Sequence, residues 1–390
     1  MALTSIQAIC IGVFAIAGAT VVYTLFGYPL LLGWMAKRHE QPVHRDEVLR
    51  SVSFVIAVHN GETFLERKLS SILALNYPRE LVEMIVVSDG SDDRTDEIVR
   101  SFAPHGVRLV QVPRGGKPAA LNVAVPMATG EILALTDIRQ TLHPDCLRNA
   151  IACFGDPKVG AVSGELQVAP GETQDENDFG VYWRYEVWIR TQMARIDSTF
   201  GCNGPFYLMR RSLWVPVSPD TLLDDVYLPL TAFFKGYRLL LEPTAIVYEL
   251  PIALHSEFKR KVRLQAGLYQ TLQIMPEMLT RRNRMRFHFV SGKYFRILLP
   301  YCLIAMALAT IGLPPPWRTL AIAAQVAFYG LAALDTILPA RFPLKRLTSP
   351  IRTFVVLISA TLIALRVFFV PPQSLWKEKT VRVAEAPHPK

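Results

Sequence analysis

The chain has 390 residues, a formal net charge of +9 and 51% hydrophobic residues, which is enough for one soluble domain of ordinary size together with a membrane part. Its five cysteines are scattered and include no CxxC pair. This pattern argues against a zinc site and against a disulfide framework, so the soluble part fits a reducing compartment.

An apolar run opens the chain at Ile6–Trp34 and is followed by Lys37 and Arg38. The run is long enough to span a bilayer. In a secretory signal the basic residues come first and the apolar core is shorter, so we interpret residues 1–36 as a retained anchor. Because cytoplasmic loops carry an excess of Lys and Arg, we expect Lys37, Arg38 and Arg45 to face the cytoplasm.

Residues 50–250 have the composition of a soluble α/β domain. In its first half, apolar segments alternate with helical patterns, and we predict strands at Val52–Val58, Met84–Val87 and Val107–Val112 and helices at Thr63–Leu75, before Phe102 and at Pro118–Met127. This alternation predicts a parallel, Rossmann-like sheet. The dinucleotide fingerprint GxGxxG is absent. A P-loop is excluded because Pro118 stands where Ser or Thr is required after Lys117.

The stretch Glu131–Asp137 is the centre of the predicted domain. Its short apolar run between Gly130 and a polar cluster is typical of a strand buried on both faces. Ligands of open α/β sheets bind at the carboxyl ends of such strands. We therefore expect Asp137 to lie at the mouth of a site.

The second half of the domain is less regular. We predict a strand at Val159–Leu166, an aromatic helix at Phe179–Met193, a loop at Gly201–Gly204, a strand at Pro205–Met209 and a helix at Asp224–Lys235. Two acids at the start of that last helix are electrostatically favourable. The Tyr and Trp side chains of the aromatic helix are expected to pack rather than to form a sugar platform.

Two basic stretches follow, at Leu254–Leu272 and around Arg281–Arg286. Such stretches bind nucleic acid or a membrane surface. Because three apolar runs come next, at Ile297–Leu313, Leu320–Leu338 and Ile351–Val370, we prefer the membrane surface and expect no nucleic acid. The predicted regions are interfacial helices in residues 251–293, transmembrane helices in 294–371 and a polar tail in 372–390.

The topology has two versions. Four spans place both termini outside, whereas Lys377, Lys379 and Arg382 in the tail favour the inside. The run at Ile297–Leu313 contains Pro300 and is the candidate to lie in the interface instead of spanning. We favour the four-span version, because short tails carry less topological weight than loops.

Acids and bases recur at the predicted ends of strands and starts of helices. The acids are Asp89, Asp137 and the pair Asp224-Asp225, and Lys117 and Arg263 supply positive charge. A nucleotide-sugar diphosphate requires such a set: one carboxylate for the base or ribose, and another for a divalent cation that neutralises the leaving diphosphate. A further carboxylate can act as base for the attacking hydroxyl.

Six short motifs follow one another over Ser51–Gly267. They are Val52–Asn60, Ser88-Asp89-Gly90-Ser91, Gly116-Lys117-Pro118-Ala119-Ala120-Leu121-Asn122, Asp137-Ile138-Arg139, Asp224-Asp225 and Arg260-Lys261-Val262-Arg263-Leu264. In this order and spacing they resemble the catalytic domain of the family 2 inverting glycosyltransferases. The resemblance is to the membrane-embedded branch, which includes the synthases of cellulose, chitin, hyaluronan and poly-N-acetylglucosamine.

The resemblance implies an α/β fold of the GT-A type that is flanked by transmembrane and interfacial helices. It also implies an enzyme of the plasma or inner membrane that uses a UDP-sugar, with Mg²⁺ or Mn²⁺ as cofactor and a cytoplasmic catalytic domain. The implied roles are uridine binding by Asp89 with Lys117 nearby, metal binding by Asp137, general base for Asp225 beside Asp224, diphosphate contact for Arg263, and an acceptor border at Cys202, Asn203 and Gly204.

Three positions depart from the family pattern. Ser88 and Arg139 stand where the family has acids, and Leu264 stands where it has Trp. Arg139 either leaves Asp137 as the one acidic metal ligand of its motif or shares the charge neutralisation. Leu264 weakens the case for processive polymer synthesis. The departures motivate an alternative function, a catalytically degenerate nucleotide-sugar sensor or assembly subunit.

The acceptor is a hydroxyl of a polysaccharide or of a lipid, and the sequence does not choose between them. Either acceptor suits cell-envelope or exopolysaccharide synthesis, with partners in a membrane assembly.

Overall fold

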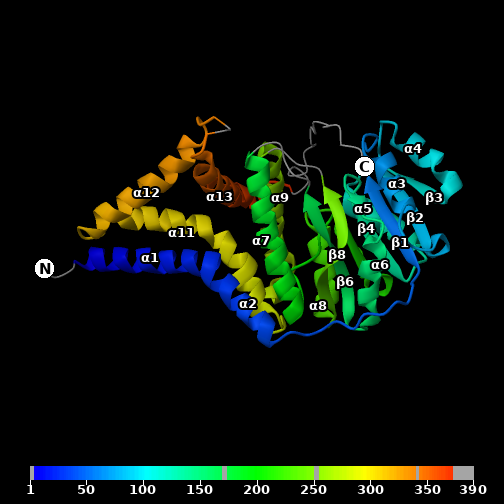
Figure 1. The fold of residues 1–390 in the computed structure, drawn as a ribbon, viewed down its shortest axis with the longest axis horizontal. Coiled ribbons are helices and arrows are strands. Elements are labelled where there is room, and N and C mark those ends of the chain that lie inside the picture. The colour runs from blue at the N-terminus through cyan, green and yellow to red at the C-terminus, as the bar shows by residue number, and fades with distance from the viewer. Residues whose placement is uncertain (1–3, 169–173, 250–253, 340–341, 372–390) are drawn as a thin grey trace.

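The computed structural model describes residues 4–168, 174–249, 254–339 and 342–371. A sheet domain lies at one end of an elongated molecule, and long helices extend from it to the other end (Figure 1). The chain enters through α1 (Ser5–Val22), a π-helical turn η1 (Tyr23–Gly27) and α2 (Tyr28–Arg38). It then runs beside the domain in an extended segment before β1 (Val52–Val58) begins.

Eight strands form one sheet in the order β3-β2-β1-β4-β7-β6-β8-β5. The bounds of the further strands are β2 Val82–Asp89, β3 Val107–Val112, β4 Ile132–Thr136, β5 Thr141–Leu142, β6 Val159–Val168, β7 Phe206–Arg210 and β8 Arg238–Glu249. β1 pairs in parallel with β2 and β4, and β2 pairs in parallel with β3, whereas β7 runs antiparallel to β4 and β6. The expected α/β, Rossmann-like domain is confirmed.

The strands in the middle of the sheet are apolar throughout because both of their faces are covered. On β1, Phe54 and Ile56 point into one core, and Val55 points into the other. The first core includes α3 (Leu65–Leu73) and α6 (Cys146–Ala152), and the second includes α5 (Lys117–Ala124). All five residues of β4 are buried, as we expected from its composition.

The second core extends beyond the sheet domain. Tyr28, Leu32 and Ala36 of α2 are at most 1% exposed and belong to the same cluster of buried side chains as Val55. Phe289 at the end of α10 (Arg286–Phe289) belongs to it as well. The end of the anchor helix is therefore part of the folded domain.

The remaining helices are α4 (Thr95–Ser101), α7 (Gln174–Ile196), α8 (Asp224–Phe234), α9 (Leu254–Ile274), α11 (Phe295–Thr310), α12 (Trp317–Leu334) and α13 (Lys345–Ala364). α7 and α9 lie between the sheet and the long helices (Figure 1). β8 and α6 were not predicted. β8 contains Pro243, which interrupts the strand pattern of its sequence. The pairing of β8 with β6 shifts register between Gly164 and Glu165.

Four segments within the described residues are long and apolar enough to cross a membrane: Ser5–Arg38, Arg286–Thr310, Trp317–Leu334 and Lys345–Phe368. They coincide with the four apolar runs of the sequence. Ile6, Ile16 and Val326 are 65–71% exposed, and exposed apolar surface on this scale marks a surface that contacts a membrane or a partner. The side of the membrane on which each loop lies stays a prediction, and the tail residues Lys377, Lys379 and Arg382 are outside the described ranges.

Candidate functional site

Lys117 joins the two halves of the candidate site. It is the first residue of α5 and follows Gly116, whose φ of 87° suits a residue without a side chain. Its Nζ lies 3.0 Å from Oδ1 of Asp137 and 3.2 Å from Oδ2 of Asp224. Burial lowers the pKa of Lys117, but the neighbouring carboxylates of Asp137, Asp224 and Asp225 more than reverse this and hold it above its usual value. The side chain is therefore a permanent cation between the end of β4 and the start of α8.

The two acids at the start of α8 have different surroundings. Asp224 is 4% exposed and pairs with Lys117, whereas Asp225 lines a cavity. Burial and then the charge of Asp224 raise the pKa of Asp225 to about 6. Leu223 is the N-cap of α8, and Asp224 is its first helical residue. Its carboxylate is directed to Lys117 instead of to the backbone amides of the helix.

The loop at Gly201–Gly204 holds Asp225 from the other side. The amide of Cys202 donates to the carbonyl oxygen of Asp225 at 2.8 Å, and the side-chain amide of Asn203 donates to Gly164 O at 3.0 Å. A Cβ on Gly204 would lie 2.9 Å from Oδ2 of Asp225 and 3.7 Å from Oδ2 of Asp137. The carboxylates of Asp137, which follows β4, and of Asp225 on α8 thus converge at Gly204. A residue with a side chain at this position would fill the space between them. Burial raises the pKa of the Cys202 thiol, which suits a packed residue rather than a nucleophile.

Asp89 holds the loop that presents Lys117. Its carboxylate is buried and accepts from the amide of Gly115 at 2.7 Å and from that of Gly116 at 2.9 Å, and it pairs with Arg114. Arg114 was not predicted, since nothing in its local sequence distinguishes it from a solvated charge. The predicted contact of Asp89 with uridine stays a prediction.

Two basic side chains, those of Lys68 and Arg139, belong to the surroundings of the turn that follows β4. Arg139 pairs with the buried carboxylate of Glu249, with Nη2 2.7 Å from Oε1. Lys68 is fully buried, and its Nζ donates to Thr136 Oγ1 at 2.7 Å and to Gln140 O at 2.9 Å. Burial lowers the pKa of Lys68 to about 7. Lys68 therefore holds the turn that carries Asp137 in place through hydrogen bonds. Arg139 is directed to Glu249, so Asp137 is the one acidic side chain of its motif.

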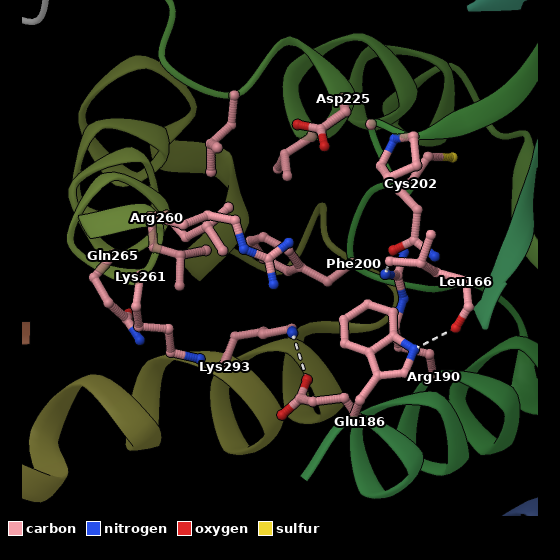
Figure 2. A pocket seen from close by; sticks show the side chains of 18 of the residues that line it. Leu166, Glu186, Arg190, Phe200, Cys202, Asp225, Arg260, Lys261, Gln265 and Lys293 are labelled. Carbon is pink, nitrogen blue, oxygen red and sulfur yellow. Dashed lines mark hydrogen bonds and ion pairs between the residues drawn. The ribbon is translucent and has the colours of Figure 1, made fainter. Parts of the chain in front are cut away.

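A cavity of about 190 Å³ lies beside Asp225 (Figure 2). Cys202, Asn203 and Gly204 border it, and their predicted role at an acceptor site stays a prediction. Four charged residues that sequence reasoning missed also line it: Glu186, Arg190, Lys293 and Arg296. Lys293 and Arg296 belong to an apolar candidate span, and charged residues in such a segment were the signal that could have indicated them.

Arg263 and Leu264 are neighbours on α9 with different positions. The charge of Arg263 lowers the pKa of Asp225, which places it near that carboxylate. Leu264 lines the cavity. The family motif at this point is therefore arranged around Asp225 even though its Trp is missing.

The two Trp residues of α7 have different surroundings. Trp183 donates its indole N–H to Leu166 O at 2.6 Å and lines the cavity. The ring of Trp188 lies 3.2 Å from where a Cβ of Gly33 in α2 would be, so the glycine allows the two helices to approach closely. The side chain of Tyr182 lies outside the described part.

The described residues contain no group of three or more His, Cys, Asp or Glu side chains that could hold a metal ion alone. The Asp137 side chain is 43% exposed, so its oxygens are accessible at the mouth of the site. Mg²⁺ is commonly bound by one or two carboxylates together with substrate phosphates. The residues present fit a cation whose coordination shell is completed by oxygen atoms of a bound diphosphate.

Comparison with known proteins gives consistent similarities. Residues 53–214 match the family described as Glycosyl transferase family 2. Poly-beta-1,6-N-acetyl-D-glucosamine synthases of Staphylococcus aureus and Staphylococcus epidermidis are each 25% identical, over 60% of this chain and 58% or 60% of theirs, respectively. This chain thus spans less than two thirds of the length of these relatives.

A solved structure of a mannosyltransferase from Pyrobaculum calidifontis, in complex with GDP-Man and Mn²⁺, has a TM-score of 0.69. It is 24% identical, and the match covers 90% of this chain and 99% of that one. The likeness concerns the fold, and together with the family match it confirms the expected GT-A type.

Proposed function

The chain carries a family 2 glycosyltransferase domain in residues 53–214, and we propose that it transfers a sugar, with inversion, from a UDP-sugar to a hydroxyl of a polysaccharide or lipid acceptor. One observation carries the proposal. The carboxylates of Asp137 and Asp225 converge at Gly204, with the Lys117 cation bonded to Asp137 and a cavity beside Asp225. We infer that a diphosphate binds on the Lys117 side and that an acceptor binds in the cavity.

Asp225 is the proposed general base. It takes the proton of the acceptor hydroxyl while that oxygen attacks the anomeric carbon and the bond from this carbon to the UDP oxygen breaks. A pKa of about 6 leaves Asp225 ionised at neutral pH and close to the optimum for a base that works there. Direct displacement of this kind inverts the anomeric centre and needs no covalent intermediate, which agrees with the buried, unreactive Cys202.

The donor side is proposed to consist of Asp89, Lys117, Asp137 and Arg263. Lys117 and Arg263 supply positive charge to the diphosphate, which leaves with an additional negative charge. Asp89 acts on the uridine and also fixes the Gly115-Gly116 loop. Asp137 would hold Mg²⁺ or Mn²⁺, which would neutralise the diphosphate.

The proposed location is the plasma or inner membrane, with the catalytic domain in the cytoplasm. The four apolar segments and the basic residues after the first of them support it. The names of the staphylococcal relatives support a role in cell-envelope or exopolysaccharide synthesis and N-acetylglucosamine as the first sugar to test.

The full chain, purified in nanodiscs with Mg²⁺, should release the nucleoside diphosphate from at least one member of a panel of nucleotide sugars, and we expect that donor to be a UDP-sugar. GDP-mannose belongs in the panel, because the mannosyltransferase of similar fold was solved with it. The Asp225→Asn variant should bind the same donor without releasing its nucleotide. Binding of a donor by the unchanged protein without any release or transfer, with polysaccharide and lipid acceptors both present, would indicate the sensor function instead.

A further inference from the structure

Most of the charged residues that line the cavity beside Asp225 are cationic. Five cationic side chains face it, Arg190, Arg260, Lys261, Lys293 and Arg296, against the carboxylates of Glu186 and Asp225. Arg260 and Lys261 come from α9 and Lys293 from the turn before α11, so cations enclose the space from separate elements (Figure 2). Such an enclosed, charged cavity focuses its potential on one kind of ligand, an anion.

Two of the charged groups in the lining have well-defined partners. Glu186 pairs with Lys293 at 3.3 Å and with Arg296. Arg190 donates to neutral oxygens, those of the Asn203 side chain and of Gly201 O, and its Nε is buried without a hydrogen-bond partner. A buried donor without a partner is costly, and an anionic ligand in the cavity would satisfy it.

The cavity also adjoins the apolar helices. Leu357 of α13 lines it, and Lys293 and Arg296 lie within the candidate span Arg286–Thr310. A ligand with an anionic group in the cavity can therefore continue into apolar surroundings. Arg side chains bind phosphate through paired, charge-assisted hydrogen bonds, and Lys side chains bind it as point charges, so a lipid phosphate suits this lining.

We propose that this cavity binds the phosphate headgroup of a lipid-linked acceptor and thereby holds the acceptor hydroxyl against Asp225. The proposal rests on the proposed transferase function and specifies its acceptor: a lipid that carries a phosphate, instead of a neutral polysaccharide chain. The phosphate contributes binding and orientation, and the reacting group is the hydroxyl beyond it.

The first test uses the unchanged full chain in neutral detergent and measures binding without donor, by calorimetry or by thermal shift. The probes are decyl phosphate, decanol and inorganic phosphate. Decyl phosphate should bind at least ten times more tightly than either of the others, because it alone supplies both the anion and the chain. Equal binding of decanol overturns the anionic site, and equal binding of inorganic phosphate overturns the lipid as its source.

The second test compares two double variants with the same change in charge. Arg260→Gln with Lys261→Gln removes two cations from the cavity and should weaken decyl phosphate at least tenfold. Arg148→Gln with Lys158→Gln removes two exposed cations on the sheet domain and should change it less than twofold. An equal loss in both pairs would show that only overall charge matters, and no loss in either would remove the cavity from consideration.

The readouts separate this inference from the proposed function. If decyl phosphate binds as stated but no UDP-sugar is consumed, the anion site stands and the transferase proposal fails. If a neutral oligosaccharide is extended at the same rate with and without a lipid phosphate, the transferase proposal stands and the inference fails.

Discussion

On one side of Asp225, three carboxylates gather round Lys117; on the other, five cationic side chains line a cavity with two carboxylates. In the proposed function the first side would receive a metal-bound diphosphate, whereas the second would receive an anionic acceptor. Asp225 belongs to both sides, and burial and then the charge of Asp224 raise its pKa to about 6. The comparison suggests how one carboxylate would serve a donor and an acceptor that both carry negative charge.

The largest effect is expected from Asp225→Asn. A positioned general base contributes about 10²–10⁴-fold, and turnover should fall by that factor while donor binding stays close to normal. Single-turnover transfer and UDP-sugar titration measure the two quantities.

Asp224→Asn is the matched control, because it makes the same change one residue away and outside the cavity. It should lose less activity and more stability, roughly 1.5–3 kcal/mol, since Lys117 loses a buried partner. If Asp224→Asn costs more turnover than Asp225→Asn, the roles of the two acids are reversed. If both variants keep normal transfer, this pair is not the site of base catalysis.

The next effect concerns the donor side. Asp137→Asn should lower activity by about 10²-fold or more without unfolding the domain. The reason is that Asp137 is the one carboxylate proposed to coordinate the cation together with the diphosphate. Excess EDTA should abolish transfer by the unchanged protein, and Mg²⁺ or Mn²⁺ should restore it. Full activity in EDTA would mean that cationic side chains such as Lys117 and Arg263 neutralise the leaving group without a metal.

Sequence reasoning located the acidic residues of the candidate site but not the ion pairs that they form. Asp137 could be found because a buried parallel strand must end at the binding edge of the sheet, and Asp225 because it opens a helix within a recognisable motif. The Lys117–Asp224 ion pair could not be found, since the fold alone brings these distant residues to 3.2 Å. The same holds for the cavity, whose cations come from α7, α9 and the start of α11.

A smaller effect should appear in the pH profile. Because burial and Asp224 raise the pKa of Asp225 to about 6, kcat/KM should fall as the pH drops below that value and the base becomes protonated. Arg263 lowers this pKa, so Arg263→Gln should shift the acidic limb upward by at least a few tenths of a pH unit. An acidic limb that stays in place would separate Arg263 from Asp225.

The smallest effect is expected at Lys68, which supports the donor side from beneath. Burial lowers its pKa to about 7 from 10.5, so between these values the unfolded chain retains a proton that the folded chain has released. Stability from this site therefore rises with pH across that window. The melting temperature of the unchanged protein should gain more between pH 7 and pH 9 than that of Lys68→Met. Identical gains would show that the lysine keeps its charge when buried.

The burial of Tyr28, Leu32 and Ala36 in the core of the sheet domain fixes the position of the domain relative to its first helix. A domain joined to its first helix through shared packing cannot swing away from the bilayer as one on a loose tether would. With the apolar segments in a bilayer, Asp225 would stay at one height above the lipid, and an acceptor whose hydroxyl lies at another depth would be out of reach of the proposed base. Fragments without residues 1–38 would lose this fixed height, and they would also expose an apolar face that the intact chain covers.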